Sequence, residues 1–200
     1  MNQAIDFYFD FSSPYGYLAA IKIDDLAARH SRRVNWRPIL LGAVFKITGA
    51  QPLPTLPLKG KYAIHDILRS ARFHSIEYTQ PAKFPIATQA PARAFYWLDA
   101  RDAAGAKRLA HALFRAYFVD NRDISSPEVT ADVAVTLGEK RADVLAALAD
   151  AAVKDKLKNE VDAAITLGVF GSPYFVIDGE PFWGIDRFDQ IERWLGRGPF

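Results

Sequence analysis

The sequence contains no cysteine. A chain without cysteine forms no disulfide, offers no thiolate to zinc or to iron–sulfur clusters, and has neither a cysteine nucleophile nor a redox dithiol of its own. Any sulfur chemistry that this protein carries out must therefore use the sulfur of a second molecule.

Long apolar runs and charge of one sign are missing as well. No stretch approaches the roughly 18 uninterrupted apolar residues that a membrane-spanning helix needs. The sequence has 25 basic and 23 acidic residues, for a formal net charge of +2, which creates no strong field for nucleic acid or an anionic membrane. The first residues also lack the pattern of a secretory signal. We therefore expect a cytoplasmic protein that binds neither nucleic acid nor membrane.

Common enzyme signatures are absent too. The sequence has no G-x-G-x-x-G, no Walker loop, no G-x-S-x-G and no H-E-x-x-H. Its four histidines lack metal-ligand spacing, so we expect no metal site. Apolar residues are plentiful by contrast: half of the 200 residues are hydrophobic and 13% are aromatic, which is enough for a sizeable core.

Short β-branched and aromatic runs occur toward the two ends of the chain. They predict strands over residues 5–11, 34–39, 174–177 and 180–183. Asp178-Gly179 between the last two is a two-residue hairpin signal. Helical spacing of apolar residues predicts helices over about 14–30, 62–73, 91–103, 106–118, 127–137, 142–149, 153–167 and 186–196.

The order of these elements is β-α-β, then a run of helices, then α-β-β-α. Without the run of helices, this order matches a thioredoxin-like sheet. We therefore predict an α/β fold in which residues 1–41 and 150–200 form a thioredoxin-like domain. Residues 42–149 would form an all-helical insertion.

Ser13 stands where the first strand gives way to a helix that starts at Pro14. A serine before proline is a common helix N-cap, and this role needs no ligand. The backbone N–H groups and the positive end of the helix dipole also favour an anion at this place, and they lower the pKa of a thiol bound there. Both roles are open, and the second would let a cysteine-free chain activate the thiol of a ligand.

Three further positions allow two interpretations each. Ser172 precedes Pro173, where a cis bond would present its backbone to an extended ligand and a trans bond would be an ordinary strand start. Asp186 either caps the last helix or binds a ligand ammonium group. Lys59 either pairs with a ligand carboxylate or is a solvated loop lysine.

Four stretches of the sequence follow one another in a fixed order from end to end. They are Phe7-Tyr8-Phe9-Asp10-Phe11-Ser12-Ser13-Pro14-Tyr15, Leu58-Lys59-Gly60, Val169-Phe170-Gly171-Ser172-Pro173 and Trp183-Gly184-Ile185-Asp186-Arg187. In this order and spacing they resemble the 2-hydroxychromene-2-carboxylate isomerases and the kappa-class glutathione transferases. The two form one superfamily in which a thioredoxin-like domain is interrupted by a helical insert.

The resemblance implies glutathione as a cofactor and gives each matching position a role. The Ser13 hydroxyl would hydrogen-bond the glutathione thiolate, and Ser172 would bind the glutathione backbone. Lys59 would face the glycine carboxylate, while the Ile185 main chain and Asp186 would hold the γ-glutamyl end. The full set of implied glutathione contacts is Ser13, Pro14, Tyr15, Lys59, Ser172, Ile185 and Asp186.

The sequence departs from the family at two positions. Family members usually carry Asn in the loop before the lysine and again after a Phe-Pro pair, and this chain has Ala50 and Ala87 there. Ala50 cannot donate a side-chain hydrogen bond, so one glutathione contact is lost unless Gln51 replaces it. Ala87 leaves the identity of the electrophilic substrate open.

The reaction implied by the resemblance is a reversible conjugate addition of the thiolate to 2-hydroxychromene-2-carboxylate. The ring opens, a bond rotates and the thiolate leaves, giving trans-o-hydroxybenzylidenepyruvate. A transferase that acts on other electrophiles or peroxides, and a glutathione-binding module without catalysis, remain alternatives. The resemblance also implies a homodimer and a small aromatic electrophile as substrate. Four aromatic residues are equally consistent with an acceptor wall and with core: Phe45, Tyr62, Phe84 and Trp183.

Overall fold

The computed structural model describes residues 4–200, so the first three residues of the predicted N-terminal segment lie outside the described part. The strands are β1 (Ile5–Phe9), β2 (Val34–Pro38), β3 (Tyr174–Ile177) and β4 (Glu180–Trp183). The helices are α1 (Pro14–Arg29), α2 (Leu41–Thr48), α3 (Lys59–Phe73), α4 (Gln89–Asp99), α5 (Ala103–Phe118), α6 (Pro127–Val135), α7 (Arg141–Ala149), α8 (Ala151–Thr166) and α9 (Phe188–Arg197). Two 3-10 turns span Leu53–Thr55 and Ile185–Arg187.

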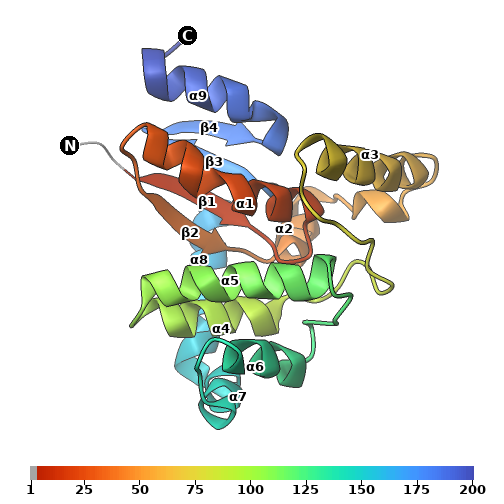
Figure 1. Ribbon diagram of the computed structural model, residues 1–200, viewed down its shortest axis with the longest axis vertical. Coiled ribbons are helices and arrows are strands. Elements are labelled where there is room, and N and C mark those ends of the chain that lie inside the picture. Colours follow the sequence, from red (N-terminus) through yellow and green to blue (C-terminus); the bar gives the residue numbers. More distant parts are fainter. Residues whose placement is uncertain (1–3) are drawn as a thin grey trace.

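The strands form one mixed sheet in the order β2-β1-β3-β4 (Figure 1). β1 pairs parallel with β2 and antiparallel with β3, and β3 pairs antiparallel with β4. Strands from opposite ends of the sequence therefore lie side by side in the centre. This is the mixed α/β sheet with an intervening run of helices that the sequence predicts.

The core is built from aromatic rings on one face of the sheet. Phe7 and Phe9 are alternate residues of β1, and Trp36 is paired with Phe7, so all three point to the same side. Helices α4 and α5 contribute Phe95 and Phe114, whose ring centroids lie 6.2 and 5.5 Å from that of Phe9. Burial of each such side chain contributes about 1.5–3 kcal/mol. The helical run is therefore packed directly onto the sheet.

Helices cover both faces of the sheet. In Figure 1, α1 lies in front of the strands, α9 lies above β4 and α8 lies behind the strands. Phe188 of α9 packs on Phe175, the β3 residue paired with Phe7, with 5.5 Å between the ring centroids. On the rear face, Arg37 of β2 meets Glu160 of α8, with 3.3 Å between Nη1 and Oε2. The division into residues 1–41 with 150–200 and an insertion of residues 42–149 stays a prediction. Within residues 4–200, each helix is too short or too polar to cross a membrane.

Local signals in the sequence predict the β3–β4 hairpin correctly. Asp178 and Gly179 have φ angles of 55° and 90°, as a two-residue turn with left-handed backbone requires. The sequence analysis does not find α2 as a separate helix. This helix is short, has no side-chain cap, and contains β-branched Val44, Ile47 and Thr48, which weaken a helical pattern.

The prediction that Asp186 caps the last helix is wrong. The chain first makes the 3-10 turn Ile185–Arg187, and α9 begins only at Phe188. Arg187 occupies the N-cap position and makes no side-chain capping hydrogen bond. The extra turn displaces Asp186 from the place where a cap would sit, and its side chain is 70% exposed.

Candidate active site

Ser13 connects the end of β1 to the start of α1. Its Oγ accepts a hydrogen bond from the N–H of Gly16 at 3.0 Å, so Ser13 is the N-cap of α1. The same hydroxyl donates to the backbone carbonyl of Ser172 at 2.9 Å. Ser13 is 6% exposed. The capping role is therefore confirmed, and the hydroxyl also faces the loop before β3.

Ser172 comes from the opposite end of the chain and completes the contact. The bond between Ser172 and Pro173 is cis. Ser172 Oγ accepts a hydrogen bond from the N–H of Asp10 at 2.9 Å. A Cβ atom at Gly16 would lie 2.7 Å from Ser172 Oγ, so only glycine fits where α1 passes this loop. Ser13 and Ser172 thus lie in one candidate site. Both are candidate ligand-binding residues in the sequence.

Tyr15 in the first turn of α1 is held by α3. Its hydroxyl donates to Asp66 Oδ2 at 2.6 Å, and Asp66 is also bonded to Arg69. Burial, and next the hydrogen bond to Asp66, raise the pKa of the Tyr15 hydroxyl. That hydrogen bond holds the pKa of Asp66 below its usual value. Tyr15 therefore stays protonated and acts here as a donor that joins α1 to α3.

Lys59 is the first residue of α3 and is exposed. Asp66, which reaches Tyr15, lies seven residues further along, or about 10 Å along the helix axis. Leu58 precedes Lys59 with a φ of 64°, and a Cβ at Gly60 would lie 2.3 Å from the carbonyl oxygen of Pro54. The turn before α3 is therefore tightly fixed, but the structure brings Lys59 into contact with neither Ser13 nor Ser172.

Ile185 and Asp186 reach the site through the backbone. The N–H of Gly184 donates to the carbonyl of Pro173 at 3.0 Å, which ties the turn after β4 to the loop of Ser172. Gly184 has a φ of 106°, and Asp186 Oδ1 would lie 2.2 Å from a Cβ built on it. The Asp186 carboxylate therefore folds back over Gly184, where it is exposed and pairs with Arg187 at 3.4 Å.

Trp183 is the one predicted acceptor residue that lies beside this loop. Its indole covers Gly171, where an added Cβ would be 2.2 Å from Nε1. Its ring centroid is 4.8 Å from that of Phe170, and both side chains are about half exposed. Tyr62 lies on the exposed surface of α3 with Arg69. The remaining two, Phe45 and Phe84, are partly buried.

Asp10 is a site residue that the sequence analysis quotes in a motif without giving it a role. It is 3% exposed, and its carboxylate accepts hydrogen bonds from the N–H groups of Ser12 and Leu41 and from the hydroxyl of Thr88. Burial raises the pKa of Asp10. The available signal was an acid between Phe9 and Phe11 at the end of an apolar strand, directly before the Ser-Ser-Pro turn.

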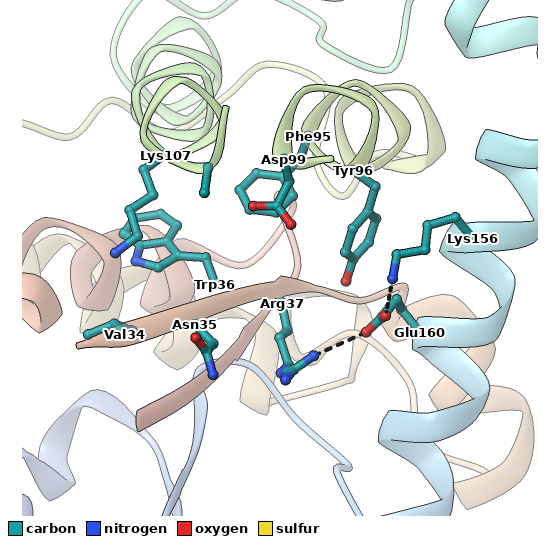
Figure 2. Close-up of a pocket in the computed structure, with 11 residues that line it drawn as sticks. Val34, Asn35, Trp36, Arg37, Phe95, Tyr96, Asp99, Lys107, Lys156 and Glu160 are labelled. Carbon is teal, nitrogen blue, oxygen red and sulfur yellow. Dashed lines mark hydrogen bonds and ion pairs between the residues drawn. The ribbon is translucent and has the colours of Figure 1, made fainter. Parts of the chain in front are cut away.

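A cavity of about 260 Å³ lies elsewhere, between β2, α4, α5 and α8. Figure 2 shows Arg37 and Lys156 directed at Glu160, with contacts of 3.3 and 2.6 Å. Arg37 also pairs with Asp6 at 2.9 Å. These charges satisfy one another, and neither Ser13 nor Ser172 lines the cavity.

The Ser13 site is suited to stabilising an anion. α1 has no acidic side chain in its first turn, so the positive end of its dipole is not neutralised by the helix itself. Ser13 and Ser172 contribute neutral hydroxyls. Because the chain has no cysteine, an anionic nucleophile at this place must arrive with a ligand.

Comparisons with known proteins identify the fold and the family of the chain. A family model described as a DSBA-like thioredoxin domain matches residues 4–196. The fold and the helix-end site thus define a protein of the DSBA-like thioredoxin class.

Curated and solved relatives narrow the class. A 2-hydroxychromene-2-carboxylate isomerase of Sphingobium xenophagum is 30% identical over 98% of this chain and 99% of its own. A glutathione S-transferase kappa 1 of Homo sapiens is 26% identical over 100% and 96%. A solved 2-hydroxychromene-2-carboxylate isomerase superposes with a TM-score of 0.88 at 27% identity, covering 98% of this chain and 95% of the other.

The chain therefore belongs to the family of 2-hydroxychromene-2-carboxylate isomerases and kappa-class glutathione transferases within the DSBA-like thioredoxin class. The family is one of glutathione-related isomerases and transferases, and this chain is an enzyme of that type.

Proposed function

We propose that this chain is a glutathione-dependent isomerase that converts 2-hydroxychromene-2-carboxylate to trans-o-hydroxybenzylidenepyruvate. The observation that carries the proposal is the contact between Ser13 at the start of α1 and Ser172 in the cis-proline loop. It sets an anion-stabilising hydroxyl beside a backbone segment that an extended ligand can pair with. Two curated relatives named for this isomerase activity support the choice of reaction.

The residues of the site fit glutathione. Ser13 supplies a hydroxyl at the N-terminus of a helix that has no acidic side chain in its first turn, and the exposed carboxylate of Asp186 suits the γ-glutamyl ammonium group. Lys59 is an exposed cation for the glycine carboxylate, at the end of a helix joined to α1 through Tyr15. Glutathione, when bound, would supply the thiolate and be regenerated after each turnover.

Each of the chain's own residues then has a defined task. The Ser13 hydroxyl, which donates to the Ser172 carbonyl in the structure, turns its proton toward the sulfur. The Ser172 backbone orients the peptide. Trp183 and Phe170 offer an exposed aromatic surface beside the same loop, against which a small aromatic electrophile can stack.

A transferase that consumes glutathione is the second candidate, and Ala50 and Ala87 favour it. Ala50 is exposed just after α2, and its backbone N–H donates to Thr48 Oγ1 at 3.3 Å. It therefore lacks the amide that the family usually has there. A changed contact set near the ligand would alter the choice of electrophile, and kappa-class relatives match over the whole chain.

An ultraviolet difference titration of glutathione at neutral pH tests the thiolate site. Wild type should give a saturable thiolate signal, and Ser13→Ala should lose it. Ser126→Ala is a matched control because Ser126 also precedes a proline and caps a helix, α6. Loss of either cap costs about 1 kcal/mol of stability, so the two variants should be destabilised equally. Only Ser13→Ala should lose the thiolate signal, because only Ser13 lies at the proposed glutathione site. A signal that survives in Ser13→Ala contradicts the proposal.

Turnover of 2-hydroxychromene-2-carboxylate separates the two candidates. The isomerase needs glutathione but leaves the free thiol concentration constant. A transferase removes one thiol for each product formed. Absence of turnover together with a normal thiolate signal would reject the isomerase and direct the search to other electrophiles or peroxides.

The homodimer and the cytoplasmic location stay predictions. Sedimentation velocity of the purified chain measures the first directly, and a monomer at micromolar concentration would contradict it. Fractionation of cells that express the chain measures the second.

A further inference from the structure

Asp10 is the one acidic or basic side chain that is buried among residues 4–200. Its position at the end of β1 places it directly behind the turn that carries Ser13. Burying a charge is costly unless it is fully hydrogen-bonded. The pattern of its partners therefore shows what this carboxyl group holds in place.

The carboxylate joins three separate segments of the chain. Oδ1 accepts from the Ser12 N–H at 2.7 Å and from the Thr88 hydroxyl at 3.0 Å. Oδ2 accepts from the N–H of Leu41 at 2.7 Å. Leu41 is the first residue of α2, so the positive end of a second helix faces this carboxylate. The Ser-Ser-Pro turn, α2 and the start of α4 thus meet at one group.

The backbone of Asp10 closes a ring with the two serines of the site. Its carbonyl accepts from the N–H of Ser13 at 2.9 Å, and its N–H donates to Ser172 Oγ at 2.9 Å. Ser13 Oγ in turn donates to the Ser172 carbonyl. A shift of Asp10 would therefore move Ser13 and Ser172 relative to each other.

We propose that Asp10 is a positioning residue for the glutathione thiolate: its carboxylate fixes the Ser12–Ser13 turn against α2 and Thr88, so that the Ser13 hydroxyl faces the sulfur while the Ser172 backbone holds the peptide. This inference rests on the proposed function. A carboxylate is required because all three groups around it are arranged to donate. An asparagine would turn an NH₂ group toward one backbone N–H and push it away.

The direction in which Asp10→Asn changes the thiol pKa of bound glutathione distinguishes a positioning role from an effect of the negative charge alone. If Asp10 acted only through its negative charge, Asp10→Asn would favour a nearby thiolate and lower the pKa of bound glutathione. If Asp10 acts by positioning, the same variant raises that pKa and reduces the thiolate fraction at neutral pH by about tenfold, the loss expected for one disturbed hydrogen bond to a charged group. A purely structural role would lower Tm and leave the thiol pKa of the folded fraction unchanged.

The test is an ultraviolet pH titration of glutathione bound to wild type, Asp10→Asn, Thr88→Val and Thr130→Val, with Tm measured for each. Thr88→Val removes one donor from outside the site turn and should shift the thiol pKa in the same direction, with roughly a threefold loss of thiolate. Thr130 is a matched control because it is also buried and donates to a backbone carbonyl, that of Ile124, at 2.9 Å. Thr130→Val should lower Tm and leave the thiol pKa unchanged.

A thiol pKa in Asp10→Asn that equals or falls below that of wild type would overturn the inference. If Asp10→Asn does not fold, the comparison of Thr88→Val with Thr130→Val decides, and equal pKa values in these two would overturn it. A wild type without any thiolate signal would instead reject the proposed function itself.

Discussion

Two helices of this protein begin with the same three residues. Ser12-Ser13-Pro14 starts α1, and Ser125-Ser126-Pro127 starts α6. In both, the second serine is the N-cap and accepts from the N–H three residues on, at 3.0 Å in α1 and 3.3 Å in α6. The local sequence therefore produces the same local structure twice.

The two helix starts differ in the group that accepts the hydrogen bond of the N-cap serine. The Ser126 hydroxyl donates to Glu128 Oε2 at 2.6 Å, so α6 carries its own anion in its first turn. The Ser13 hydroxyl donates to the neutral backbone carbonyl of Ser172, in the loop before β3, and α1 has no acidic side chain in its first turn. The start of α6 already has an anion, Glu128, in its first turn. The first turn of α1 has none, so this helix start can stabilise an anion supplied by a ligand. An N-cap becomes a candidate site only through its distant neighbours.

Gly16→Val should have the largest effect on this comparison, because it gives α1 the residue that α6 has at the same place, Val129. An added Cβ at Gly16 would lie 2.7 Å from Ser172 Oγ and force the two loops apart. We expect glutathione affinity to fall by about 100-fold, which corresponds to a loss of about 2.8 kcal/mol of binding free energy. Calorimetric titration measures it.

Gly42→Ala is the control for this substitution, since nothing lies within 4 Å of its added Cβ. It should bind glutathione like wild type. Equal affinity of Gly16→Val and wild type would show that the close approach of α1 to the Ser172 loop has no part in binding.

Asp186→Asn should have the next largest effect on glutathione affinity. It tests a second difference between the two helix starts, because α6 has no counterpart of the turn that carries Asp186. Loss of a charge-assisted contact to the γ-glutamyl ammonium should weaken glutathione binding by about tenfold. A glutathione analogue that lacks this amino group should bind wild type and variant equally well. A difference between the two proteins with that analogue would contradict the assigned contact.

Tyr15→Phe should have a smaller effect, of about threefold on glutathione affinity, because it only loosens α1 from α3. It also changes the acid stability. The Tyr15 hydrogen bond lowers the pKa of Asp66 in the folded state, so its stabilisation is present above the unfolded pKa near 3.8 and is lost as pH falls through the folded value. Tm of wild type should therefore fall more steeply below pH 4 than Tm of Tyr15→Phe. Parallel curves would contradict this.

Glu128→Gln should have the smallest effect and acts on the other helix. Donation by Ser126 lowers the pKa of Glu128, so its contribution is present above the ordinary pKa of 4.5 and is lost as pH falls through the folded value. Tm should fall slightly at pH 7, and the difference from wild type should disappear once the pH lies below the lowered pKa of Glu128 in the folded state. The glutathione thiolate signal should not change, and a change would show that the two helix ends are coupled.

The sequence predicts those features that depend on neighbours along the chain. The N-cap Ser13, the Asp178-Gly179 turn and the β3–β4 hairpin all follow from residues a few positions apart. The capping interpretation of Asp186 is wrong because a single 3-10 turn shifts the start of α9 beyond the reach of its side chain. Capping is sensitive to a shift of one or two residues.

The tertiary part of the site lies beyond such signals. The family resemblance assigns Ser13 and Ser172 to one glutathione site. No local pattern predicts their contact, because the two residues are 159 positions apart. The role of Asp10 depends on Leu41 and Thr88, which no spacing rule connects to it. The same limit explains why Lys59 is a plausible anion partner in the sequence and yet contacts neither serine in the structure.

The central position of β1 has a consequence for synthesis of the protein. β1 pairs with β2 almost as soon as both have left the ribosome, but its other neighbour, β3, begins only at Tyr174. Closing so long a loop costs more entropy than any local pairing. This edge of β1 therefore has no partner strand until the seven helices α2 to α8 have been synthesised. The contact between Ser13 and Ser172 can form only after β3 and the loop before it have been made.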